Sequence, residues 1–157
     1  MPKPKTPLLT VDCVLFDGDG RVLLIRRKNP PFQGDLALPG GFVDIGETVE
    51  NAARRELEEE AGVKIGRIKL VGVYSDPQRD PRGHTCAVAF TAQVKRAKAV
   101  AGDDAAAVEW VAGWRRARLA FDHRRIVADA WKLSAPKAKA KAQGKAKVKA
   151  KAKSKAD

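Results

Sequence analysis

The chain has 157 residues, of which 44% are apolar and 32% charged, which predicts one folded domain and excludes a wholly disordered chain. No apolar run approaches the roughly 18 residues of a membrane span, and the start of the chain lacks the apolar core of a secretory signal. Cys13 and Cys86 are too few for a disulfide framework. We therefore expect reduced thiols, a cytoplasmic location and no membrane contact.

The net charge of +12 is unevenly distributed along the chain. Residues 134–157 hold nine lysines and one acid, largely in lysine–alanine alternation and without any aromatic residue. Such a segment has no apolar face to pack against a core, so we interpret it as a disordered basic tail. We expect an N-terminal tail over residues 1–7, a folded domain over 8–133 and the basic tail over 134–157.

The apolar runs of the folded part predict several strands and two helices. A turn sequence at Asp17–Gly20 joins the first two runs, which predicts a hairpin. A breaker at Asn29–Pro31 and a loop over 38–41 precede the first helix, which Gly62 ends. In chain order, the predicted elements are strands 11–16 and 22–25, helix 48–61, strands 65–74, 85–94 and 108–111, and helix 121–133.

The helix over 48–61 has acidic residues on its predicted core face, which is formed by Val49, Ala52, Ala53, Leu57 and Ala61. Glu56 and Glu60 lie within this face, at about −20° and +20° from Val49, and Glu59 lies at its edge. Like charges that face inward are costly without a cation, and the negative helix C-terminus adds to that cost. The inward position of these glutamates on the helix therefore favours a bound Mg²⁺ or Mn²⁺ ion over a run of solvated charges.

The same helix is part of a longer motif. From Gly41, five residues lead to Glu47 and seven more lead to Arg55, which starts the run Arg-Glu-Leu-Glu-Glu-Glu-Ala-Gly-Val over 55–63. Every fixed position of the Nudix box is present, and the chain resembles a Nudix hydrolase over most of residues 8–133. The resemblance implies an α/β fold, an α/β/α sandwich around a mixed β-sheet, and hydrolysis of a nucleoside diphosphate derivative at its pyrophosphate.

The resemblance also implies roles for residues of the box. The implied metal ligands are the carbonyl of Gly40 and the carboxylates of Glu56, Glu59 and Glu60. Glu47 and Arg55 are expected to form an ion pair that organises the loop and the helix. Gly41 and Gly62 are expected to meet backbone requirements, because glycine tolerates a positive φ.

Hydrolysis of a pyrophosphate needs screening of its charge and a general base. Bound divalent ions would screen the anionic phosphorus and acidify a bound water. The candidates for the catalytic base are Glu56 and Glu59 in the box, Asp103 and Asp104 on a later loop, and then Glu109. A solvated turn is an equally good interpretation of the two loop aspartates.

Further segments narrow the resemblance to the compact ADP-ribose pyrophosphatases. These segments are 31–32, 37–43, 74–84 and 119–123, with prolines 14 and 18 residues beyond Val63. The resemblance implies AMP and ribose 5-phosphate as products, and a homodimer that builds the adenosine site across its interface.

The candidates for substrate contact lie in two of these segments. Phe32 is a candidate for stacking on adenine, with core packing as the alternative. Arg79, Arg82 and His84 are candidates for contacts with phosphate or ribose, because arginine suits bidentate phosphate binding. A solvated loop is the alternative for each of the three.

Two other functions are compatible with the box. One is a triphosphatase that sanitises the nucleotide pool, and the other is a non-enzymatic regulator that binds ADP-ribose or a related metabolite. The Ser75–His84 segment favours ADP-ribose over triphosphates, and the intact box disfavours the regulator. The lysines of the tail suit weak, sequence-independent contact with nucleic acid, with a solubilising extension as the alternative.

Overall fold

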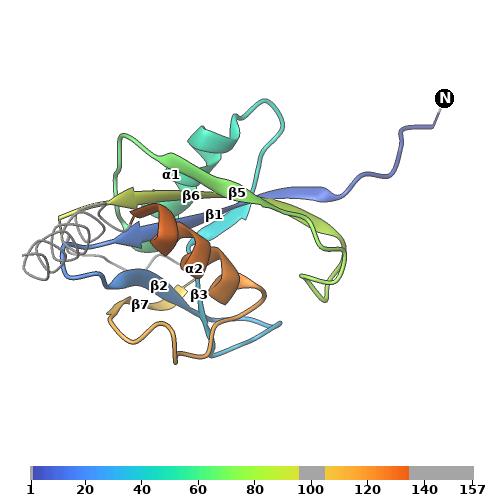
Figure 1. The fold of residues 1–157 in the computed structure, drawn as a ribbon. Helices are drawn as coiled ribbons and strands as arrows, with labels where there is room; N and C mark the ends of the chain where they lie inside the picture. The colour runs from blue at the N-terminus through green and yellow to red at the C-terminus, as the bar shows by residue number, and fades with distance from the viewer. Residues whose placement is uncertain (1, 96–104, 135–157) are drawn as a thin grey trace, which may run out of the picture.

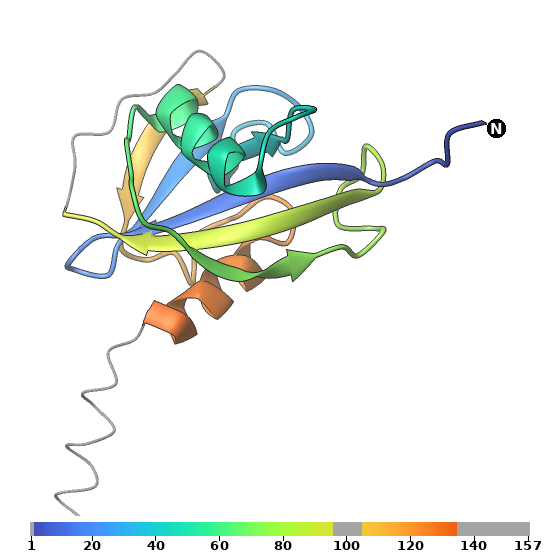
Figure 2. The same cartoon turned by 90° about the horizontal axis from the view of Figure 1, so that it is seen from above.

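The computed structural model describes residues 2–95 and 105–134. Within them, one mixed β-sheet lies between two helices, which cover its opposite faces (Figures 1 and 2). This arrangement confirms the predicted α/β sandwich. The elements in chain order are β1 (Leu8–Phe16), β2 (Val22–Arg27), β3 (Leu36–Ala37), β4 (Gly40–Phe42), α1 (Val49–Ala61), β5 (Lys69–Tyr74), β6 (Thr85–Gln93), β7 (Ala105–Val111) and α2 (His123–Ser134).

The sheet has the strand order β3-β2-β1-β6-β5, with β4 also paired to β1 and β7 to β2. β1 and β6 run parallel, and the other strand pairs are antiparallel. The predicted hairpin is confirmed, since Phe16 lies opposite Val22. The predicted loop over 38–41 is partly wrong, because Gly40–Phe42 pairs with β1 as a short strand.

The central strand β1 supplies side chains to both layers of the core. Val14 and Phe16 pack in the cluster that includes residues of α2, whereas Cys13 and Leu15 pack in the cluster that includes Leu57 of α1. Successive side chains of a strand point to opposite faces, which explains this alternation. Asp12 interrupts the apolar run of β1, yet its side chain is buried.

Helix α1 begins and ends where the sequence predicts. Thr48 caps its start, since the Thr48 side chain accepts a hydrogen bond from the Asn51 N–H at 3.2 Å. Gly62 ends it with φ of 63°, and the Gly62 N–H donates to the carbonyl of Glu58. The buried residues of the helix all belong to the predicted core face: Ala52, Ala53, Leu57 and Ala61.

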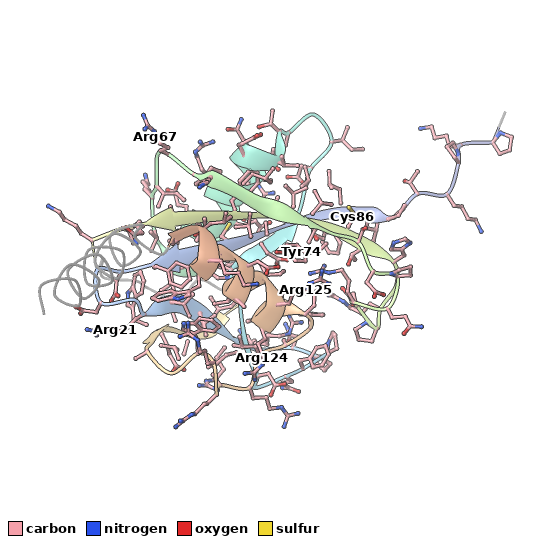
Figure 3. The ribbon with its side chains drawn as sticks, in the orientation of Figure 1. Arg21, Arg67, Tyr74, Cys86, Arg124 and Arg125 are labelled. Carbon is pink, nitrogen blue, oxygen red and sulfur yellow. The ribbon has the colours of Figure 1, made fainter. Side chains whose placement is uncertain are left out.

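Helix α2 begins two residues later than predicted, because Phe121 has φ of 52°, outside the right-handed helical region. Tyr74 of β5 joins this helix to the sheet. Its hydroxyl donates to Asp129 at 3.0 Å, and the guanidinium carbon of Arg125 lies 5.7 Å from its ring centroid. Tyr74 and Arg125 are labelled in Figure 3. Neither helix among the described residues is long and apolar enough to cross a membrane.

Two predicted features lie largely outside the described residues. α2 extends to Ser134, the first residue of the predicted tail, and the rest of that tail is not described. The predicted loop bases Asp103 and Asp104 also lie outside the described residues.

Candidate active site

A cleft of about 380 Å³ is lined by residues of β1, β2, β4 and α1 and by the loops beside α2. Charged side chains dominate its lining. The acidic ones are Asp12, Asp44, Glu56, Glu60 and Asp80, and the basic ones are Arg27, Arg55, Arg79 and Arg82. The cleft therefore brings together the box carboxylates and a set of guanidinium groups, most of which lie far from the box in sequence.

Glu56 projects from α1 against the backbone of β4. Its side chain is 12% exposed, and a Cβ added at Gly41 would lie 2.6 Å from Glu56 Cδ. Gly62 has a positive φ, as its predicted backbone role expects, whereas Gly41 is not among the glycines with positive φ. A side chain at position 41 would displace the Glu56 carboxylate from its position against β4. Burial raises the pKa of Glu56 above its ordinary value, although Arg55 opposes that shift.

Glu60 lies one turn further along α1 and lines the same cleft. Its Oε2 accepts a hydrogen bond from the Gly40 N–H at 2.9 Å, so the helix and β4 are tied together at this point. A side chain at Gly40 would overlap the backbone carbonyl of Val11, so glycine is required at this position. Glu56 and Glu60 therefore both point inward from α1, as the helical periodicity predicts.

Arg55 is the centre of the box. It makes the predicted ion pair with Glu47 at 2.9 Å, which holds the pKa of that carboxyl below its ordinary value. Its Nη1 also donates to Glu56 at 2.8 Å and to Glu59 at 3.2 Å. Glu59 is 58% exposed and is not part of the cleft lining. One guanidinium thus orients three box carboxylates, and Asp44 lies 3.9 Å away.

The donor set of this region fits a divalent cation. Within residues 2–95 and 105–134, no three acidic, histidine or cysteine side chains already surround one point as a bound metal requires. However, the carboxylates of Glu56 and Glu60 and the backbone of Gly40 meet in one cleft and offer hard oxygen donors. Burial raises the pKa of Glu56, and a nearby divalent cation would favour its charged form.

A second charged network is centred on Arg79, which the sequence predicts as a substrate contact. Arg79 lines the cleft, yet its side chain is only 5% exposed. It donates to Asp122 through two bonds of 2.9 and 2.7 Å, to Asp12 at 3.2 Å and to Thr85 at 3.1 Å. Most of its donors are therefore engaged within the protein, where they join β1, β6 and the start of α2.

His123 extends this network towards the box. Its Nδ1 accepts a hydrogen bond from the Leu38 N–H at 2.9 Å, and its Nε2 lies 3.4 Å from Asp12. An accepting Nδ1 carries no proton, so the Nε2–H faces the carboxylate. Burial would raise the pKa of Asp12, but His123 and Arg79 together hold it below its ordinary value. Asp12 is not among the site residues predicted from the sequence, although a carboxylate inside an apolar strand is a usable signal.

Arg82 and His84, two further candidates for substrate contact, lie in different surroundings. Arg82 lines the cleft, is 50% exposed and forms an ion pair with the buried Asp80 at 2.8 Å. His84 is exposed and not part of the cleft lining, and its Nε2 lies 3.1 Å from the carbonyl of Ser75.

Phe32 and Glu109 also lie outside the cleft lining. The Phe32 ring packs edge-on against Phe121, with ring centroids 4.9 Å apart. Glu109 pairs with Arg26 at 2.6 Å.

A family model described as "NUDIX domain" matches residues 6–130 of this chain. The chain belongs to the NUDIX domain family. This confirms the resemblance to the Nudix hydrolases that the box alone indicates. An ADP-ribose pyrophosphatase from Methanocaldococcus jannaschii is 48% identical over 129 residues, which is 80% of this chain and 75% of that relative.

Two more proteins are similar to this chain. The ADPR responsive transcriptional repressor NtrR of Acinetobacter baylyi is 33% identical over 80% of this chain, which spans only 54% of the repressor. The NUDIX domain of Shewanella oneidensis NrtR, solved as a cocrystal with ADP ribose, matches with a TM-score of 0.76 and 34% identity. That match covers 82% of this chain and 88% of the solved chain.

Proposed function

We propose that this NUDIX domain hydrolyses ADP-ribose at its diphosphate and releases AMP and ribose 5-phosphate. The observation that carries the proposal is the 48% identity to an ADP-ribose pyrophosphatase across 75% of that protein's length. The cleft supports it, because the carboxylates Glu56 and Glu60 line one cavity together with four arginines. An acidic centre surrounded by guanidinium groups suits an anionic substrate that arrives with a divalent ion.

The proposed metal ligands are the Gly40 carbonyl and the carboxylates of Glu56, Glu59 and Glu60. The proposed ion is Mg²⁺, with Mn²⁺ as a substitute. When bound, such an ion supplies Lewis-acid stabilisation of phosphate oxygens and lowers the pKa of a bound water. The protein contributes orientation: Gly40 N–H holds Glu60, and Arg55 holds both Glu56 and Glu59.

The proposed reaction is attack of water on one phosphorus with cleavage of the bridging P–O bond. A carboxylate takes the proton of the water, and the proposed bases are Glu56, Glu59 and the loop residues Asp103 and Asp104. Among the described candidates, Glu59 is the more exposed, and Arg55 contacts both glutamates. Glu59→Gln should lower kcat and remove the acidic limb of the kcat–pH profile if Glu59 is the base. An unchanged kcat–pH profile would mean that another carboxylate accepts the proton of the water.

A substrate panel tests the function. The panel contains ADP-ribose, NADH, a diadenosine polyphosphate and 8-oxo-dGTP, each assayed with Mg²⁺ at neutral to alkaline pH and again with excess chelator. We expect the highest kcat/KM for ADP-ribose and no turnover with chelator. A preference for 8-oxo-dGTP would instead support the triphosphatase.

A regulator that binds ADP-ribose is the second candidate, and the similarity to NtrR is the observation that favours it. The chain spans about half of that repressor, and its box carboxylates are intact. ADP-ribose that binds tightly and is recovered uncleaved after incubation with Mg²⁺ would support this candidate over the hydrolase.

We also propose that the chain forms a homodimer. Apolar side chains are exposed at the start of β1, on β4 and just beyond it, and association would bury them. They are Leu8, Leu9, Phe42 and Ile45. A monomeric mass by light scattering at micromolar concentration would contradict the proposal.

The basic tail is proposed to make weak nucleic-acid contact, on the basis of its nine lysines alone. Removing residues 135–157 should abolish DNA and RNA binding at low salt while kcat for ADP-ribose stays unchanged. Gel-shift and hydrolysis assays on the same truncated protein measure both. Undiminished nucleic-acid binding would place the basic surface on the domain instead.

A further inference from the structure

The link between β3 and β4 is held by one side chain from each helix. This link, residues 38–40, leads from β3, which pairs with β2, into β4, which pairs with β1. The Leu38 N–H donates to Nδ1 of His123 in α2 at 2.9 Å. The Gly40 N–H donates to Oε2 of Glu60 in α1 at 2.9 Å. Both backbone donors of the link are therefore held by side chains rather than by a neighbouring strand.

The rest of the link has little freedom. Pro39, between the two donors, has no N–H, and its carbonyl accepts a hydrogen bond from the Cys13 N–H of β1 at 2.8 Å. Leu38 is only 2% exposed, and a buried N–H that lacks an acceptor is costly. The imidazole of His123 therefore satisfies a buried donor of the link.

The ring of His123 is fixed at both of its nitrogen atoms. Its side chain is buried, and its Nε2 lies 3.4 Å from Asp12, which Arg79 contacts at 3.2 Å. Because Nδ1 accepts from Leu38, the proton of the ring is on Nε2 and faces the carboxylate. Groups that hold a metal ligand from outside the metal centre set its orientation, and their loss lowers metal affinity. His123 has such a place relative to Gly40, since it holds the link two residues before it.

We propose that His123 is a positioning residue for the divalent cation. Its Nδ1 fixes the Leu38 N–H and with it the link that carries the Gly40 carbonyl, a proposed ligand. A shift of the link would also move the Gly40 N–H, which holds Glu60. Loss of one imidazole contact would therefore disturb a backbone ligand and a carboxylate ligand together. The inference rests on the proposed function, since it takes Gly40 and Glu60 as ligands of the ion.

The test uses two variants that each keep one of the two imidazole contacts. In His123→Asn the side-chain oxygen can take the place of Nδ1 and accept from Leu38, whereas in His123→Gln the longer side chain places its NH₂ group towards Asp12. Binding of Mn²⁺ to the full chain is measured without substrate, from the electron paramagnetic resonance signal of the free ion. His123→Gln should weaken Mn²⁺ binding about 10-fold, and His123→Asn should bind nearly as the wild type does.

Thr91→Val is the matched control for a general loss of stability. The Thr91 hydroxyl donates to the Val14 carbonyl at 2.9 Å in a buried hydrogen bond, and Thr91 does not line the cleft. Tm should fall in Thr91→Val and in both His123 variants, and Mn²⁺ binding is compared well below these temperatures. Thr91→Val should leave Mn²⁺ binding unchanged. Mn²⁺ binding by His123→Gln that equals that of the wild type, or that is weakened no more than in His123→Asn, would overturn the inference.

Hydrogen exchange in the wild type tests the same coupling without a variant. If the contact between His123 and Leu38 strengthens binding of the ion, the bound ion must strengthen that contact in turn. Mg²⁺ should therefore slow exchange of the Leu38 N–H more than that of the Val94 N–H, which donates to Phe16, the last residue of β1. Equal slowing of both N–H groups would contradict the inference even if His123→Gln did not fold.

Failure of the proposed function gives a different result. A wild type that binds Mn²⁺ but does not hydrolyse ADP-ribose would contradict the proposed reaction, while the His123 variants would still decide the positioning role, because Mn²⁺ binding is measured without substrate. A wild type that binds no Mn²⁺ would overturn both the proposed ligand set and the positioning role of His123.

Discussion

Two arginines organise the two charged regions of this NUDIX domain, and they differ in burial, since the Arg55 side chain is 28% exposed and that of Arg79 only 5%. Arg55 lies between Glu47, Glu56 and Glu59, so carboxylates outnumber cations around it. Arg79 is almost completely buried and shares its donors among Asp12, Asp122 and a threonine hydroxyl, with His123 beside Asp12.

This difference indicates that the first region serves the proposed reaction and that the second stabilises the fold. The cluster around Arg55 keeps excess negative charge at the cleft, where the proposed cation and the anionic substrate would bind. The network around Arg79 satisfies its own hydrogen bonds and links β1, β6 and the start of α2. Loss of a residue should therefore affect catalysis in the first region and folding stability in the second.

The largest expected effect comes from removing a cleft carboxylate. Glu56→Gln or Glu60→Gln should lower kcat about 1000-fold, because each removes a proposed metal ligand. Glu56→Gln should unfold no more easily than wild type at pH 7, since burial already raises the pKa of Glu56 and so disfavours its charged form. Hydrolysis assays and thermal melts measure the two quantities.

Glu58→Gln is the control for that prediction, because Glu58 is exposed and pairs with Lys64 at 3.1 Å. It should keep nearly full activity. Full activity in both Glu56→Gln and Glu60→Gln would contradict the proposed ligand set.

The network around Arg79 should show the opposite response. Asp12→Asn should lower the free energy of unfolding by about 3 kcal/mol at pH 7, because it breaks a buried charge pair. Because the pKa of Asp12 is lowered on folding, its stabilisation is present above its ordinary value of 3.8 and is lost as the pH falls through the folded value. Urea unfolding curves at neutral and acidic pH measure this difference. If Asp12→Asn were instead stable but inactive, Asp12 would have a role in catalysis.

Gly41→Ala tests how closely the Glu56 carboxylate must be held. The new Cβ would overlap that carboxylate, so Glu56 has to move. A displacement of about 1 Å at a reacting centre can cost about 100-fold in rate, which is the loss we expect in kcat. Unchanged kcat would mean that the position of Glu56 is not critical. Circular dichroism provides the check that the variant is folded.

The smallest effect is expected at the start of α1. Thr48→Ala should lower the free energy of unfolding by about 1 kcal/mol, because the Asn51 N–H loses its acceptor. kcat should stay within about twofold of wild type, since the cap is remote from the charged end of the helix. A large loss of kcat would show that the first turn of α1 helps to place the carboxylates.

Most of the cluster around Arg55 could be predicted from the sequence, because its members lie within one helix and the loop before it. Helical periodicity placed Glu56 and Glu60 inward and Glu58 outward, and the Glu47–Arg55 pair followed from the box. Short β4 was missed, since three residues carry too little pattern to distinguish a strand from a loop.

The sequence by itself determined the family, the strand-rich fold with two helices and the inward phase of the acidic helix, because these depend on local periodicity and on one continuous motif. Only the tertiary structure decided which other charges share the cleft. Asp12, Arg79 and Asp122 are far apart in the chain and meet because β1, the β5–β6 loop and α2 pack together. The same packing neutralised Arg82 with Asp80, since ion pairing depends on distances that sequence spacing does not define.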